Sequence, residues 1–120
     1  MIIRKFWMTI LWFLLILYGS FTPKNTLNPE WFLFKHQDKV IHSVLYGVLM
    51  ILFLYNYSSY SQLQKRVFVY ASVSFICISF CIEILQPILS QRSFEFADIL
   101  SNAIGLFLGM AGYRLIFYKR

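Results

Sequence analysis

The residues of this sequence that could do chemistry are few, and they stand near the ends of apolar segments. Among 120 residues there are only five acids: Glu30, Asp38, Glu83, Glu95 and Asp98. A carboxylate at membrane depth is costly unless it is paired or hydrated, so such a residue is a functional candidate by default. When the apolar segments are threaded through a bilayer, all the acids fall at the same membrane face. This convergence predicts a shared polar site.

The segment that begins near residue 38 carries polar residues at helical spacing. Asp38, His42 and Tyr46 recur every four residues, so on a helix they share one face, with His42 about 6 Å below Asp38. Lys39 adds a cation beside them. Asp38 also suits a helix N-terminus, where the helix dipole favours a carboxylate. Two interpretations stay open: a binding site, or a helix-terminal acid with His42 bonded to a neighbouring helix.

A second polar face lies late in the third apolar segment. Ser79, Glu83 and Gln86 are spaced by four and then three residues, which places them on one side of a helix. Glu83 has isoleucine on both sides in the sequence, so it is the acid hardest to explain as a hydrated surface charge. The structural alternatives are an ion pair with Arg92 or Lys39, or a neutral, protonated carboxyl group.

The connection between the last two segments should hold an arginine at the same level. Pro87 either ends the third helix or kinks it. Residues 90–96 form a turn too short to leave the surface, which places Arg92 beside the ends of both helices. The planar guanidinium group can bind either a carboxylate or a phosphate through two parallel hydrogen bonds. Both partners stay open.

The last segment carries one continuous stripe of polar and small residues. Asp98, Asn102, Gly105, Gly109 and Gly112 recur at intervals of four, three, four and three. Glycines at this spacing let another backbone approach closely, which is the usual packing device in membranes. We predict helix packing along the glycines. Association of two copies through Gly105 and Gly109 is a further alternative.

Composition indicates a membrane protein. The chain is 59% hydrophobic and only 13% charged, which is too apolar for a soluble globule of this size. Four stretches approach the length needed to cross a hydrocarbon core of about 30 Å. They are residues 6–21, 40–57, 67–85 and 97–118. We predict an all-α membrane protein, one domain over residues 1–120 that forms a four-transmembrane-helix bundle, with the first helix retained rather than cleaved.

The net charge of +6 is interpreted as a topology signal and not as a nucleic-acid footprint, because the basic residues form no single patch. By the positive-inside rule both termini are expected to be cytoplasmic. The side expected to be cytoplasmic carries Arg4, Lys5, Lys65, Arg66, Arg114, Lys119 and Arg120. The other side carries Lys24, Lys35, Lys39 and Arg92, together with the acids.

No cofactor and no metal is predicted. Cys77 and Cys81 lie one turn apart on one helix, so they are poor disulfide partners and are interpreted as packing residues. The sequence has no H-E-x-x-H or other metal signature. Hard oxygen ligands with one imidazole would suit Mg, Mn or Zn, which is a weaker alternative. That alternative would use Asp38, His42, Glu83 and Asp98.

Taken together, these motifs resemble the VanZ-like family of small bacterial membrane proteins. The resemblance covers residues 38–112. It rests on Asp38-Lys39-x-x-His42-x-x-x-Tyr46, Glu83-x-x-Gln86, and Arg92-x5-Asp98-x3-Asn102-x2-Gly105-x3-Gly109. It implies an integral protein of the bacterial cytoplasmic membrane, and the family takes its name from a protein associated with teicoplanin resistance. It supplies no reaction, cofactor or substrate.

The position of the polar residues limits the function. They lie within roughly 10 Å of the outer boundary by helix rise, and no chain of ionisable residues continues across the bilayer, which argues against a transporter. The leading hypothesis is binding or rearrangement of an anionic lipid-linked headgroup, the partner being a membrane lipid or a lipid-linked envelope precursor. The candidate ligand-binding residues are Asp38, Lys39, His42, Tyr46, Glu83, Gln86, Arg92, Asp98 and Asn102. The alternatives are a membrane enzyme that uses His42, Glu83 or Asp98, and a structural subunit.

Overall fold

The computed structural model describes residues 2–23, 30, 33–34, 36–90 and 92–117, and within these residues the regular elements are all helices. In chain order they are α1 (Ile2–Lys5), α2 (Trp7–Ser20), α3 (Gln37–Ser58), α4 (Lys65–Leu89) and α5 (Phe96–Ile116). The all-α prediction is confirmed. The expected end of the last helix at residue 118, and the basic residues Lys24, Lys35, Lys119 and Arg120, lie outside the described residues.

Three of the described helices are long and apolar enough to cross a membrane. α3, α4 and α5 contain 22, 25 and 21 residues. α2 contains 14 residues. At 1.5 Å per residue α2 is about 21 Å long, which is shorter than a hydrocarbon core of about 30 Å. The structure therefore supports three spanning helices and one short apolar helix, and the fourth span stays a prediction.

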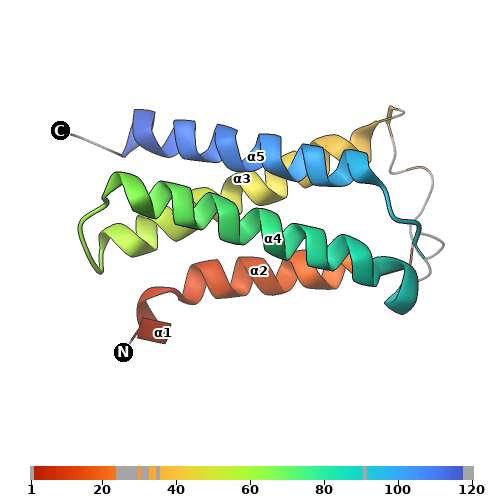
Figure 1. Ribbon diagram of the computed structural model, residues 1–120, viewed down its shortest axis with the longest axis horizontal. Coiled ribbons are helices and arrows are strands. Elements are labelled where there is room, and N and C mark those ends of the chain that lie inside the picture. The colour runs from red at the N-terminus through yellow and green to blue at the C-terminus, as the bar shows by residue number, and fades with distance from the viewer. Residues whose placement is uncertain (1, 24–29, 31–32, 35, 91, 118–120) are drawn as a thin grey trace.

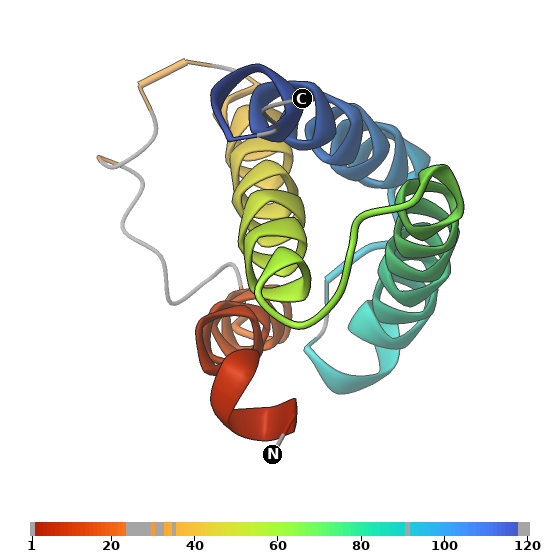
Figure 2. The same ribbon diagram turned by 90° about the vertical axis from the view of Figure 1, so that its left-hand side faces the viewer.

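The helices run alternately in opposite directions along the long axis of the molecule (Figure 1). The N-terminal ends of α3 and α5 and the C-terminal end of α4 lie at one end. α1, the connection between α3 and α4, and the C-terminal end of α5 lie at the other end. In the view along the axis, α5 stands between α3 and α4, while α2 lies beside α3 (Figure 2). The fold thus brings the polar helix ends predicted from the sequence to one end of the bundle.

The bundle is filled by large apolar side chains in its middle. The buried apolar cluster consists of Ile16, Tyr46, Leu49, Met50, Leu54, Ala71, Leu106 and Tyr113. Trp12 joins α2 to α3, since its Nε1 donates to the carbonyl oxygen of Leu45 at 2.8 Å. Leu14, Val73 and Phe107 are exposed on the outside. Such outward apolar side chains are what a hydrocarbon solvent requires of the helices that span it.

α3 and α5 approach more closely than side chains would permit, because glycines line their contact. A Cβ atom at Gly105 would overlap the backbone of Ser43, and one at Gly109 would overlap the backbone of Gly47. Gly47 is the small residue that α3 contributes to this contact, and the spacing of the α5 glycines did not predict it. Gly112 has only a loose neighbour, Ile51 Cδ1 at 3.9 Å from an added Cβ. The tight part of the predicted stripe is therefore Gly105 and Gly109, and it packs within the chain. Association of two copies stays a prediction.

One of the two alternatives for Pro87 is excluded, and the interpretation of the cysteines is corrected. α4 continues through Pro87 to Leu89, so Pro87 does not end the helix. The turn beyond the proline is held by Ser90, whose N–H and Oγ both donate to the carbonyl oxygen of Gln86 at 2.9 and 2.8 Å. Cys77 and Cys81 are unpaired and exposed, so they do not pack inside the bundle.

The α3–α5 contact predicts opposite effects for two glycines of one helix. Gly109→Ala should destabilise the bundle by about 1–3 kcal/mol, because the new methyl group forces the two backbones apart. Gly112→Ala, the matched control, should be neutral or slightly stabilising, since alanine favours helix by up to about 1 kcal/mol. Unfolding of the purified protein by sodium dodecyl sulfate in detergent micelles measures both. Equal losses at the two positions would contradict the contact.

Candidate functional site

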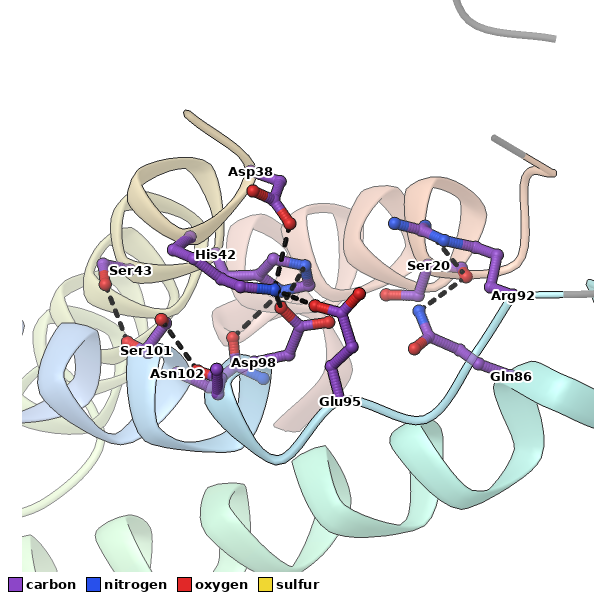
Figure 3. Close-up of polar contacts among 12 residues, drawn as sticks. Ser20, Asp38, His42, Ser43, Gln86, Arg92, Glu95, Asp98, Ser101 and Asn102 are labelled. Atoms are coloured by element: carbon purple, nitrogen blue, oxygen red, sulfur yellow. Dashed lines mark hydrogen bonds and ion pairs between the residues drawn. The ribbon is translucent and has the colours of Figure 1, made fainter. Parts of the chain in front are cut away.

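Four charged side chains at the N-terminal ends of α3 and α5 form an ion cluster at the polar end of the bundle. Lys39 Nζ lies 3.0 Å from Asp38 Oδ2 and also contacts Glu95 Oε2 and Asp98 Oδ1. Figure 3 shows the carboxylates of Asp38, Glu95 and Asp98 converging on one point, which this ammonium group fills. Asp98 is the most deeply placed, with 5% of its side chain exposed. We call these four residues the acid–lysine cluster.

The cluster can form because of how α3 and α5 begin. Asp38 lies in the first turn of α3, Asp98 lies in the first turn of α5, and Glu95 precedes that turn as the N-cap residue. Carboxylates at helix N-termini interact favourably with the positive end of the helix dipole. Since both N-termini point to the same end of the molecule, their acids meet there (Figure 1).

A hydrogen-bonded chain links α3, α5 and α4 directly below the cluster. His42 Nδ1 lies 3.1 Å from Asn102 Oδ1, and Asn102 Nδ2 donates to Ser79 Oγ at 2.6 Å. With the amide in this orientation, the proton of the His42–Asn102 bond belongs to Nδ1. His42 Nε2 then faces Asp98 Oδ1 at 3.8 Å. Tyr46 lies one turn further along α3 and is 2% exposed, and its side chain interacts with Ser79 and, electrostatically, with Glu83.

A second polar group fixes the C-terminal end of α2. Gln86 Nε2 donates to the carbonyl oxygen of Ser20 at 2.8 Å. Arg92 Nη1 donates to the carbonyl oxygens of Gly19 and Ser20 at 3.1 and 3.3 Å (Figure 3). The last carbonyl groups of a helix lack partners within the helix, so these two side chains supply them. Within the described part of the chain, Arg92 therefore binds backbone oxygens and not a carboxylate.

Glu83 stands between these two groups. On α4 it follows Ser79 by four residues and precedes Gln86 by three, so the three side chains share a buried face. Glu83 is 1% exposed, and its Oε2 has no hydrogen-bond partner. Its carboxylate faces the backbone N–H of Glu95 and interacts electrostatically with Asp98. Among the described residues it makes no ion pair within 4 Å, so the ion-pair alternative for Glu83 is not what the structure shows.

The polar end has more acid than base. The acid–lysine cluster and Glu83 together hold four carboxyl groups: Asp38, Glu83, Glu95 and Asp98. The cations near them are Lys39 and Arg92. With every group ionised and His42 neutral, four negative charges against two positive charges leave a formal charge of −2. Charges held away from water need partners, so this excess negative charge could be compensated by a ligand that brings positive charge.

The structure brings most of the predicted site residues together, in two groups rather than one. The acid–lysine cluster and the chain below it contain Asp38, Lys39, His42, Asp98 and Asn102. Gln86 and Arg92 belong to the α2 contact, and Glu83 separates the two groups. Glu95 was not predicted as a site residue, because it precedes α5 and so has no helical spacing to mark it. Ser20 was not predicted either, because it takes part through its carbonyl group, a group every residue has.

Three helices able to span a membrane, with a buried polar site at one end, define a membrane protein. The family model described as VanZ/LLP1 matches residues 3–117, and the chain therefore belongs to this family. The match begins well before residues 38–112, on which the sequence resemblance rests, so it includes α2. No curated protein and no solved structure matches the chain.

The chain from His42 to Ser79 predicts a large stability effect at Asn102. Asn102→Ala should lower the free energy of unfolding by about 2 kcal/mol, because His42 and Ser79 each lose one buried hydrogen bond. Ser101→Ala is the matched control one residue away, since Ser101 Oγ donates only to the carbonyl oxygen of Ala97 in its own helix. Denaturation by sodium dodecyl sulfate in micelles measures both variants. Similar losses would mean that Asn102 does not hold the helices together.

Proposed function

We propose that this protein binds an anionic lipid-linked headgroup at the outer face of the bacterial cytoplasmic membrane. The polar end of the bundle is the binding end, and both termini are cytoplasmic. The observation that carries the proposal is the confinement of buried charge to that end. Among the described residues, the buried Asp, Glu, His, Lys and Arg side chains are His42, Glu83 and Asp98, all at the polar end. A transport path would continue such groups across the membrane, whereas a headgroup site needs them only at one face.

The distribution of basic residues supports this orientation. Arg4, Lys5, Lys65, Arg66 and Arg114 are all exposed. They lie on the parts of α1, α4 and α5 at the end opposite the site (Figure 1). Positive residues of this kind remain on the cytoplasmic side and attract the anionic lipids of that leaflet. The polar end then faces the outer side of the membrane.

Arg92 is the residue proposed to contact the phosphate of the headgroup. A guanidinium group has five N–H donors in a planar fork, and only Nη1 is used in the contacts with α2. Arg92 is partly exposed at the rim of the site. A phosphate oxygen bound there would sit beside Glu83 and the acid–lysine cluster. The excess negative charge of the site would therefore lower its affinity for the phosphate.

A catalytic role is the second candidate, favoured by the setting of His42. Asn102 orients its Nδ1, which leaves Nε2 as the proton-accepting atom on the side of Asp98. A histidine held in this way can act as a general base. His42 is buried, so a substrate would have to displace the cluster above it. Release of a product from a short-chain polyprenyl phosphate would support this catalytic role.

Binding of a lipid phosphate tests the proposed function directly. The purified full chain in nanodiscs should bind a short-chain polyprenyl phosphate and not the corresponding polyprenol, which has no phosphate. Arg92→Lys should weaken binding about tenfold, because lysine keeps the charge and loses the planar fork. Arg66→Gln, at the opposite end, is the control and should bind like the wild type. Native mass spectrometry measures bound lipid, and equal binding of phosphate and alcohol would contradict the proposal.

The link to glycopeptide resistance is tested in cells. Expression in a sensitive Gram-positive host should raise resistance to teicoplanin and leave vancomycin susceptibility unchanged. Glu83→Gln should abolish the rise at matched membrane levels, because it alters the buried carboxylate between the two polar groups. The minimum inhibitory concentration measures each effect. No rise with a well-inserted wild-type protein would count against this function and favour a structural subunit.

A further inference from the structure

The three carboxylates around Lys39 are arranged as ligands of one ion. One oxygen atom from each of Asp38, Glu95 and Asp98 lies within 4.8 Å of the others. Two oxygens bound to the same Ca²⁺ at 2.3–2.6 Å can be at most about 5 Å apart, and those around Mg²⁺ at most about 4 Å. The spacing therefore suits a hard divalent cation after small side-chain shifts. Lys39 Nζ marks the place that a cation takes between these oxygens.

An ammonium group only partly satisfies this arrangement. It carries one positive charge, while the three carboxylates carry three negative charges, and Asp98 is almost completely buried. Lys39 has a long, flexible stem and its side chain remains 19% exposed, so its head can leave toward water. A divalent cation in its place would neutralise the acids more fully.

Glu83 is the independent observation that positive charge is needed here. It is 1% exposed, its Oε2 lacks a partner, and its carboxylate faces the backbone N–H of Glu95, a residue of the cluster. A buried carboxylate without a compensating charge is strongly unfavourable. Arg92 and Lys39 both interact electrostatically with this carboxylate, but the hydrogen bonds of Arg92 go to the carbonyl groups of α2. Glu83 therefore adds a fourth acid that Lys39 alone does not balance.

We propose that Asp38, Glu95 and Asp98 form a site for a hard divalent cation such as Mg²⁺, Mn²⁺ or Ca²⁺, which exchanges with the ammonium group of Lys39. His42 and Asn102 lie directly below this site, with His42 Nε2 3.8 Å from Asp98 Oδ1. Oxygen-only ligands select this class of metal over softer ones. The site also explains how an acidic end could hold an anionic headgroup, because the cation would bridge the carboxylates and the phosphate. That bridging role rests on the proposed function, whereas the cation site does not.

Mn²⁺ binding tests the cation site. Electron paramagnetic resonance on the full chain, purified in detergent with EDTA and then freed of it, should show one saturable Mn²⁺ per chain that Mg²⁺ or Ca²⁺ displaces. Glu95→Gln should weaken binding about tenfold or more, as loss of a metal-site contact does. Lys39→Met should tighten binding, because the competing ammonium group is gone. Glu30→Gln removes the remaining acid of the chain and should leave Mn²⁺ affinity unchanged.

The Lys39 variant separates the proposal from a purely structural ion cluster. If Lys39 only neutralises the acids, Lys39→Met lowers the unfolding temperature and no Mn²⁺ restores it. If the cation site exists, added Mn²⁺ restores the unfolding temperature of Lys39→Met and has no such effect on the double variant with Glu95→Gln. Absence of saturable Mn²⁺ binding to the wild type, or equal binding to Glu95→Gln, would overturn the proposal.

Lipid binding with and without metal separates this inference from the proposed function. Polyprenyl phosphate should bind at least about tenfold more tightly with Mg²⁺ than with EDTA, and inorganic phosphate should compete only weakly, if the cation bridges a lipid headgroup. Equal lipid binding in EDTA would overturn the bridging role and leave the proposed function standing. Saturable Mn²⁺ binding without any lipid binding would overturn the proposed function and leave the cation site standing.

Discussion

The close approach of α3 and α5 is the constraint on which the rest of the structure depends. Gly105 and Gly109 let the backbone of α5 touch that of α3, so the two helices lie in a fixed register. The register is visible in the polar pairs along the contact. Lys39 meets Asp98, His42 meets Asn102, and Ser43 Oγ donates to the carbonyl oxygen of Ser101, at separations of 59, 60 and 58 residues. Parallel helices at nearly constant offset put their N-termini, and the acids in them, side by side.

α4 and α2 complete the site in that order. Ser79 binds Asn102 from the opposite side, which places the buried face of α4 against the α3–α5 pair. Gln86 reaches the last carbonyl group of α2 from that same face. The short helix α2 is thereby fixed to the polar end, although it is not long enough by itself to span a bilayer. Glu83 is enclosed by these contacts, and although its carboxylate faces the backbone N–H of Glu95, its Oε2 has no hydrogen-bond partner.

Much of the site could be predicted from sequence because helical spacing and membrane depth are local properties. The four-residue step from Asp38 to His42 and from Asp98 to Asn102 follows from helix geometry alone. Partners across helices could not be predicted in the same way. Of the two partners expected for Arg92, the carboxylate is not found within the described residues, where Arg92 binds the carbonyl groups at the end of α2, and the phosphate stays a prediction. A helix end has unpaired carbonyl oxygens whatever its sequence, so no residue type predicts that a side chain will bind there.

The sequence by itself determined that this chain is an all-helical membrane protein, that its acids gather at one end, and that it belongs to a recognisable family. Hydropathy, helical period and motif spacing are local properties that can be read directly from the order of the residues. Tertiary structure alone decided which groups meet. It placed Glu95 with Asp38 and Asp98 around the ammonium group of Lys39, and it left an oxygen of Glu83 without a hydrogen bond. These outcomes depend on the register between helices, and that register is set by backbone contact at glycines whose partner helix the sequence does not name.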